Sequence, residues 1–168
     1  METIYFKGTP CHTYGTLPEV GEKAPCFNLV TPELKEIHCD EYRGKRVVLN
    51  VFPSLDTPVC AASVRRFNEE ASKLEDTVVL CVSMDLPFAA GRFCEAEGIT
   101  NVTAASAFRS PMFAERYGLQ IVDGPLAGLL ARAVIIVDGD RKIIYRELVE
   151  EITNEPDYVE ALAVLGKH

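Results

Sequence analysis

The sequence has no tryptophan, only three histidines, and no apolar stretch near the roughly 18 residues that a membrane helix needs. Basic residues are also few, since 17 Lys and Arg stand against 25 Asp and Glu, a formal net charge of −8. An acidic chain repels phosphate backbones and anionic lipid headgroups, so we expect neither a nucleic-acid nor a membrane partner. Residues 1–8 lack the basic and apolar regions of a signal peptide, so we expect a cytoplasmic protein.

The composition is otherwise ordinary for a globular protein. Hydrophobic residues make up 48% of the 168 residues and charged residues 25%, which excludes disorder and low complexity as the main state. A chain of this length can bury a substantial core. We therefore expect a single domain spanning residues 1–168.

Cysteine is more frequent than a reducing compartment leads one to expect, with six residues in the chain. No two of them are spaced C-x-x-C, so neither a zinc ribbon nor a thioredoxin-type redox motif is predicted. A disulfide-stapled secreted scaffold is not expected at this length without a signal peptide. Four cysteines lie in strand-like or loop contexts with no helix cap beside them, and we expect them to be buried structural thiols: Cys11, Cys26, Cys39 and Cys81.

Apolar β-branched runs alternate with helix-like segments, which predicts an α/β protein. The expected strands are Thr3–Lys7, Cys11–Tyr14, Phe27–Val30, Glu36–Cys39, Arg46–Phe52, Thr77–Met84, Val102–Ala105, Ala133–Asp138 and Lys142–Glu147. The expected helices are Pro58–Leu74, Pro87–Gly98, Pro111–Tyr117 and Pro156–Leu165. This order is that of a thioredoxin-like fold, with a central mixed β-sheet flanked by helices and an N-terminal β-hairpin.

One cysteine stands in a different setting. A buried strand ends at Phe52, Thr57 suits a helix N-cap, and Pro58 suits the first helical position, so Cys60 falls in the first helical turn. The helix dipole favours an anion such as a thiolate there, but it is worth only about 0.3–1 kcal/mol at exposed sites and up to ~2 at best. A thiolate at neutral pH therefore needs further donors, which Thr57 and an arginine can supply.

The motif Pro53-x-x-x-Thr57-x-x-Cys60 resembles the signature of peroxiredoxins. Three further features are similar to the bacterial thiol peroxidase group of atypical two-cysteine peroxiredoxins. A second cysteine, Cys94, follows 34 positions later (94 − 60), an arginine stands in the run 128–133 as Arg132, and an N-terminal hairpin is predicted. The resemblance covers essentially the whole chain.

The resemblance implies a thiol-dependent peroxidase that reduces hydrogen peroxide and organic hydroperoxides without a metal or other cofactor. Cys60 would be the peroxidatic cysteine, whose thiolate attacks the peroxide and becomes a sulfenic acid. Thr57 would hydrogen-bond thiolate and peroxide, Pro53 would shield the sulfenic acid, and Arg132 would stabilise the thiolate and orient the peroxide. Cys94 would resolve the sulfenic acid as an intrachain Cys60–Cys94 disulfide. The family also implies thioredoxin as reductant and a homodimer.

Three alternatives remain. A cysteine hydrolase would pair Cys60 with one of the three histidines, His12, His38 or His168, none of which lies in an obvious catalytic loop. A metal site built from 11–12 and 38–39 is awkward, because adjacent strand residues point to opposite faces. A non-catalytic thioredoxin-fold binding module would not need the combination of Thr57, Cys60 and Arg132. If Arg132 lay outside the site, another cation would be needed from Arg65, Arg66 and Arg109.

Overall fold

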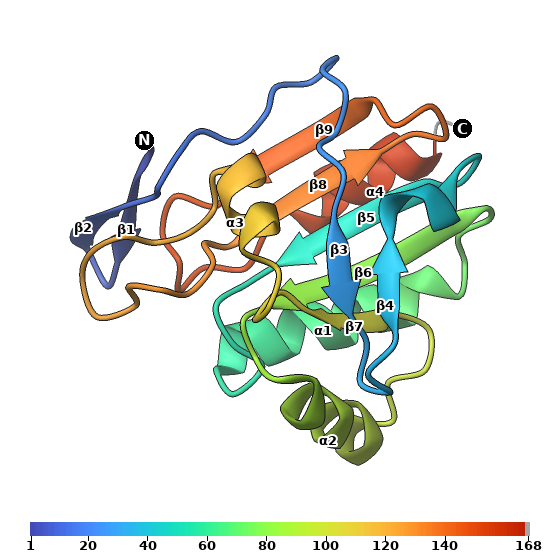
Figure 1. Cartoon of the computed structure of the whole chain (residues 1–168), viewed down its shortest axis with the longest axis horizontal. Helices are drawn as coiled ribbons and strands as arrows, with labels where there is room; N and C mark the ends of the chain where they lie inside the picture. Colours follow the sequence, from blue (N-terminus) through green and yellow to red (C-terminus); the bar gives the residue numbers. More distant parts are fainter. Residues whose placement is uncertain (167–168) are drawn as a thin grey trace.

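The computed structural model describes residues 1–166 and contains a seven-stranded mixed sheet beside a two-stranded N-terminal hairpin (Figure 1). The strands are β1 Thr3–Phe6, β2 Thr9–His12, β3 Asn28–Val30, β4 Glu36–His38, β5 Arg46–Val51, β6 Thr77–Ser83, β7 Thr103–Ser106, β8 Ala133–Val137 and β9 Ile143–Leu148. The helices are the 3-10 helix η1 Cys39–Tyr42 and the α-helices α1 Pro58–Ala71, α2 Pro87–Glu97, α3 Pro111–Tyr117 and α4 Tyr158–Gly166.

The large sheet has the strand order β4-β3-β7-β6-β5-β8-β9. Its centre is parallel, because β5 pairs with β6 and β6 with β7 in the same direction. The remaining pairs, including β5 with β8 and β3 with β4, are antiparallel. The predicted thioredoxin-like fold with a central mixed sheet, flanking helices and an N-terminal hairpin is confirmed.

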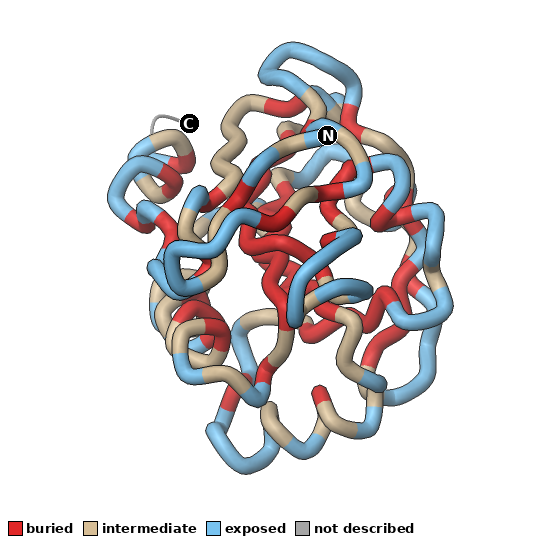
Figure 2. The backbone as a smooth tube through the Cα atoms, turned by 90° about the vertical axis from the view of Figure 1, so that its left-hand side faces the viewer, coloured by how far each residue is buried: buried red, intermediate tan, exposed pale blue. Residues whose placement is uncertain are grey.

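Side chains that alternate along the central strands pack into two separate apolar cores, one on each face of the sheet. On β5, Leu49 and Val51 belong to one cluster, which also contains α3 residues and the buried side of the N-terminal hairpin. Val48 lies in the other cluster, with residues of α1, α2 and α4. This is the two-fold periodicity of a strand buried on both faces. Figure 2 shows the buried backbone gathered at the centre of the molecule, with exposed segments around it.

The predicted elements are all present, with small shifts at their ends. The N-terminal hairpin turns at Lys7 and Gly8, both of which have positive φ (52° and 81°), so Pro10 lies in β2 rather than in the turn. A two-residue turn with two left-handed residues matches the twist of a hairpin. Helix α1 ends at Ala71 instead of Leu74. Among residues 1–166, no helix has the length and apolar composition that a membrane crossing needs.

Candidate active site

Strand β5 and helix α1 place Cys60 as the sequence predicts. The chain leaves the sheet after Val51, turns through a short loop, and enters α1 at Pro58, so that Cys60 is its third residue. Thr57 is the N-cap residue, but its hydroxyl donates to the Ser54 carbonyl (2.9 Å) and does not cap the helix. The predicted position of Thr57 as the N-cap residue is therefore confirmed, although its side chain makes no capping hydrogen bond.

An acidic side chain that sequence reasoning missed, Asp85, fixes this loop. It follows β6, and its carboxylate accepts hydrogen bonds from the Ser54 hydroxyl (2.8 Å), the Leu55 N–H (2.8 Å) and the Ser83 hydroxyl (2.7 Å). Parallel strands end at one edge of a sheet, so an acid just after β6 meets the loop that leaves β5. An acidic residue soon after a predicted buried strand was the signal available in the sequence. Asp85 thereby ties the Cys60 loop to the start of α2.

Arg132 lies directly against the Cys60 sulfur. Its guanidinium Nη2 is 3.3 Å from Cys60 Sγ, and its Nε donates to the Ile152 carbonyl at 2.8 Å. Arg132 immediately precedes β8, the antiparallel neighbour of β5, which carries it to the end of the sheet where α1 begins. Cys60 has no exposed surface and Arg132 is 2% exposed.

Arg132 carries a positive charge that is buried beside Cys60. An arginine is always protonated, and burying an unpaired cation costs several kcal/mol. None of the ion pairs among residues 1–166 includes Arg132. The Cys60 sulfur lies 3.3 Å from this buried guanidinium and accepts a hydrogen bond from it. The Arg132 Nη1 is buried without a hydrogen-bond partner in the described part of the chain and remains available as a donor.

The remaining predicted site residues lie around this pair. Pro53 is buried in the loop between β5 and α1. Cys94 is half-buried on α2 and packs against the same apolar cluster that contains Cys60, yet both cysteines are free thiols. Burial, and secondarily the negative charge of Glu33, raises the pKa of Cys94 above its usual value. Neighbouring Cys81 is more deeply buried, and desolvation raises its pKa to about 12. At neutral pH both are therefore neutral thiols.

The other candidate cations and histidines are engaged elsewhere. Arg65 pairs with Glu97, Arg66 with Glu70, and Arg109 with Glu36. His12 contacts Asp123 at 2.7 Å, and His38 lies beside two other cysteines. His168 lies outside the described residues. The geometry around Cys60 thus gives no support to a Cys-His hydrolase within residues 1–166.

Cys26 and Cys39 form a disulfide, so the expectation that they are buried structural thiols is wrong. The reason is the antiparallel register of β3 and β4, which pairs Asn28 with His38 and so brings the cysteines beyond the strand ends together. Cys26 and Cys39 lie at nearly equal distances along the chain from the turn between β3 and β4, and this spacing was a signal in the sequence. The metal cage considered from residues 11–12 and 38–39 is not assembled either, because within the described chain the clustered ligands are Cys26, His38 and Cys39.

A thioredoxin-like sheet with a buried cysteine and arginine at one strand end defines a thiol-chemistry protein of the redoxin class. The Redoxin family model matches residues 19–162. The thiol peroxidases of Corynebacterium glutamicum and Mycobacterium tuberculosis are each 55% identical over 166 residues, which is 99% of this chain and 100% and 99% of theirs. The chain therefore belongs to the Redoxin family, and its resemblance to thiol peroxidases is confirmed.

Solved structures agree with this assignment. A peroxiredoxin-like protein from Aquifex aeolicus matches with a TM-score of 0.94 and 43% identity, covering 99% of this chain and 97% of that one. The thiol peroxidase from Chromobacterium violaceum matches with a TM-score of 0.87 over 98% of this chain and 95% of that one. The second likeness, at 20% identity, concerns the fold alone.

Proposed function

We propose that this protein is a thiol peroxidase that uses the Cys60 thiolate to reduce hydrogen peroxide and organic hydroperoxides. The observation that carries the proposal is the buried pair of Cys60 Sγ and Arg132 Nη2, 3.3 Å apart. A buried cation whose nearest ionisable partner is a thiol stabilises the thiolate, which is the nucleophilic form. The confirmed relationship to thiol peroxidases supports the same reaction.

In this reaction the Cys60 thiolate attacks the terminal peroxide oxygen, the O–O bond breaks, and Cys60 becomes a sulfenic acid. The leaving oxygen departs as water or an alcohol after taking a proton. We assign the unpartnered Nη1 of Arg132 to hold a peroxide oxygen, together with the N–H groups of Val59 and Cys60. Thr57 would join them after turning its hydroxyl from the Ser54 carbonyl, and buried Pro53 would keep water from the sulfenic acid.

Cys94 would then attack the Cys60 sulfenic acid, forming the intrachain disulfide and releasing water. A disulfide needs Cα atoms about 4.4–6.8 Å apart, and the two cysteines lie on separate helices, so α1 and α2 have to unwind locally. Helix α2 ends at Gly98 in the left-handed conformation (φ 66°) and has a second glycine, Gly91, in its middle. Interior glycine weakens a helix by about 1 kcal/mol relative to alanine, which favours such opening.

The remaining parts of the proposal are a thioredoxin reductant, a cytoplasmic location and a homodimer. Support for the dimer comes from an open, mostly apolar hollow beside the start of α2. Its exposed apolar side chains include Leu86, Phe88 and Phe108, at 45%, 68% and 61% exposure. Apolar side chains grouped in this way mark interaction surfaces more often than isolated ones do. A second copy of the chain is the partner we propose for it.

The test of this function is the variant Cys94→Ser, with Cys81→Ser as the matched control on the neighbouring strand. Cys94→Ser should react once with peroxide and accumulate a Cys60 sulfenic acid that a sulfenate-reactive probe labels, but it should not turn over with thioredoxin. Cys81→Ser should turn over like the parent protein. Normal turnover of Cys94→Ser would contradict the role of Cys94, and absence of any labelled sulfenic acid would contradict that of Cys60.

A further inference from the structure

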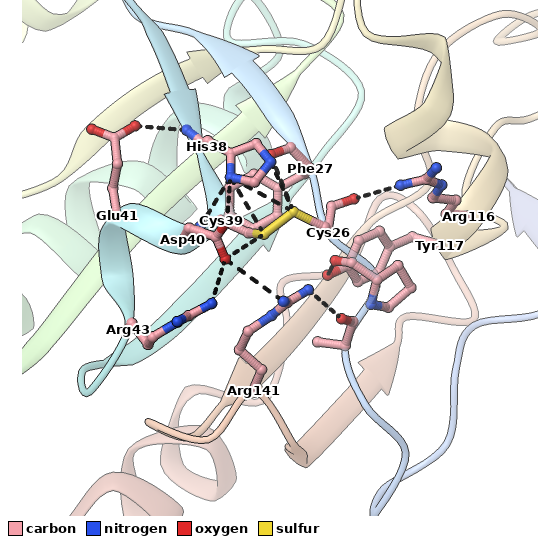
Figure 3. The surroundings of a disulfide bond; sticks show 12 residues. Cys26, Phe27, His38, Cys39, Asp40, Glu41, Arg43, Arg116, Tyr117 and Arg141 are labelled. Carbon is pink, nitrogen blue, oxygen red and sulfur yellow. Dashed lines mark hydrogen bonds and ion pairs between the residues drawn. A yellow bond between two sulfur atoms is a disulfide. The ribbon is translucent and has the colours of Figure 1, made fainter.

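The Cys26–Cys39 disulfide lies at the open end of the β3–β4 hairpin (Figure 3). The hairpin register brings the two cysteines to a Cα–Cα distance of 5.4 Å, within the range that a disulfide bridges without backbone movement. The backbone is also held independently of the bond, because the Cys39 N–H donates to the Phe27 carbonyl at 3.1 Å. The two sulfurs therefore stay close when the bond is open.

His38 presents a ring N–H to one of the two sulfurs. Its Nδ1 accepts a hydrogen bond from the Asp40 N–H (3.2 Å) in the tautomer that carries the proton on Nε2, and in the doubly protonated ring Nδ1 donates to the Asp40 carboxylate at 3.3 Å. Nε2 lies 3.3 Å from Cys26 Sγ, and in a protonated ring it is a donor as well. A disulfide sulfur accepts hydrogen bonds weakly, whereas a thiolate accepts them strongly. His38 is thus placed to stabilise a thiolate at Cys26 once the disulfide opens.

The two sulfurs differ in access. Cys26 is half-buried and lines a pocket of about 300 Å³ next to α3, whereas Cys39 is only 7% exposed. Two arginines line the same pocket. Arg109 pairs with Glu36, whereas Arg116, among the ion pairs of residues 1–166, has no acidic partner and donates to the Cys26 carbonyl at 3.4 Å. The pocket thus offers an attackable sulfur beside a free positive charge.

We propose that Cys26 and Cys39 are a second redox centre, which exchanges with small carboxylate-bearing thiols bound in this pocket. A thiolate RS⁻ attacks Cys26 Sγ, the Cys26–Cys39 bond breaks, and Cys39 leaves as a thiolate that takes a proton from water. A second RS⁻ attacks the outer sulfur of the mixed disulfide, releasing RSSR and a Cys26 thiolate held by His38 Nε2. The pair gains two electrons and two thiols become one disulfide; RSSR reverses both steps.

This centre is separate from the proposed peroxidase site. Cys39 belongs to the apolar cluster on the α3 side of the sheet, and Cys26 packs against that cluster. Cys60 belongs to the cluster on the opposite face, against which Cys94 packs. The proposal does not depend on peroxide chemistry, so it is tested in the double variant Cys60→Ser/Cys94→Ser, where the peroxidase site is silent.

The experiment equilibrates that double variant with mixtures of mercaptopropionate and its disulfide, in the presence of a chelator. Free thiols are then trapped with iodoacetamide and mapped by peptide mass spectrometry. We expect reversible opening of Cys26–Cys39 while circular dichroism shows an intact fold, with Cys26 alkylated before Cys39. A disulfide that opens only after denaturation would be structural and would overturn the proposal. A parallel sample receives zinc and no chelator. If its reduced pair retains zinc and resists reoxidation, Cys26, His38 and Cys39 bind a metal instead, and the proposal is overturned.

Two substitutions in the same background test the assigned roles. His38→Leu should slow alkylation of reduced Cys26 by about tenfold or more, as expected for loss of a hydrogen bond to a charged group, and His38→Gln should restore part of the rate. Mercaptopropionate should reduce the disulfide about fivefold faster, per thiolate, than cationic cysteamine, as for an exposed ion pair, and Arg116→Gln should remove this preference. Unchanged alkylation in His38→Leu, or an unchanged thiol preference in Arg116→Gln, would contradict the corresponding role.

Discussion

The molecule carries two pairs of cysteines in opposite structural settings. Cys60 and Cys94 lie on two helices over one face of the sheet and are free thiols, whereas Cys26 and Cys39 flank a hairpin on the other side and are bonded. Strand register alone brings the second pair together. The first pair lies on two separate helices, and its proposed disulfide requires those helices to open locally.

The comparison shows that backbone context decides which cysteine does which chemistry. Cys60 combines complete burial with a guanidinium nitrogen of Arg132 3.3 Å from its sulfur. Cys26 combines partial exposure with a neutral or cationic imidazole, so it is open to thiols in solution. The first arrangement suits attack on a peroxide, and the second suits exchange between sulfurs.

The largest expected effect is on peroxide consumption, which should depend on Cys60 and not on Cys26. Cys60→Ser should lower the rate of peroxide consumption by more than about a thousandfold, because a serine hydroxyl is a far poorer nucleophile than a thiolate. Cys26→Ser and the control Cys11→Ser should stay within about twofold of the parent protein, since neither side chain contacts Cys60. Steady-state peroxide consumption measures all three. A large loss of peroxide consumption in Cys26→Ser with the fold intact would contradict the separation of the two cysteine pairs.

The next effect concerns Arg132, the buried cation beside Cys60. Arg132→Met should slow the second-order reaction with peroxide by about 10²–10³-fold, as for loss of a donor aimed at developing charge. It should also move formation of the Cys60 thiolate to higher pH, measured by ultraviolet absorbance. The free energy of unfolding should change by less than about 3 kcal/mol, because removing a buried charge offsets the loss of the hydrogen bond to the Ile152 carbonyl.

Arg132→Lys is the matched control for this substitution. It keeps the charge but not the forked donors, so the thiolate should form near its usual pH while the peroxide reaction remains slow. An Arg132→Met variant with unchanged rate and unchanged thiolate titration would place Arg132 outside the chemistry.

A smaller effect is expected at the loop that presents Cys60. Asp85→Ala removes the acceptor of three hydrogen bonds and leaves the Leu55 N–H without its partner, which should cost about 1–3 kcal/mol of stability and about tenfold in peroxide rate. Asp85→Asn should recover most of both. Asp56→Ala, on the exposed part of the same loop, is the control and should change neither. Equal effects of the Asp85 and Asp56 substitutions would contradict the positioning role.

The smallest effect is a pH dependence at Glu151, in the loop that follows β9. Hydrogen bonds from the Thr153, Gly8 and Lys7 N–H groups lower the pKa of Glu151 from 4.5 to about 2. The stabilisation is present above pH 4.5, the unfolded value, and is lost as pH falls toward 2. Glu151→Gln should therefore be less stable than the parent above pH 4.5, with the difference shrinking at lower pH.

The control for this pH effect is Glu150→Gln, whose side chain is exposed. Acid denaturation curves of the three proteins measure the difference, and amide hydrogen exchange at Gly8 and Thr153 localises it. A pH-independent difference between Glu151→Gln and the parent protein would contradict the role of the carboxylate. Because Ile152 accepts the Arg132 Nε, this loop also supports the Cys60 pair.

Much of the fold was predictable because its signals are local. Apolar β-branched runs such as 46–52 define buried strands, and Thr57-Pro58 marks the start of α1. The closeness of Arg132 to Cys60 was predicted through the family resemblance, since nothing local in residues 128–133 shows which strand end that run meets.

The features that were missed depend on contacts between distant segments. The Cys26–Cys39 bond follows from the β3–β4 register, and Asp85 acts on a loop 30 positions away (85 − 55). The Thr57 hydroxyl was expected to hydrogen-bond the thiolate and the peroxide, and in the structure it donates to the Ser54 carbonyl. In each case the residue type was visible in the sequence and its partner was not.

The most direct test of the account is intact-protein mass spectrometry before and after one equivalent of hydrogen peroxide, followed by peptide mapping. Starting from protein with Cys26–Cys39 closed and the other thiols reduced, we expect the loss of two hydrogens, about 2 Da, mapped to a new Cys60–Cys94 disulfide. Hydrogen exchange should quicken at 62–67 and 92–98, where α1 and α2 unwind, and stay unchanged around Cys26. A disulfide joining Cys60 to any other cysteine, or oxidation that spares Cys60, would contradict the account.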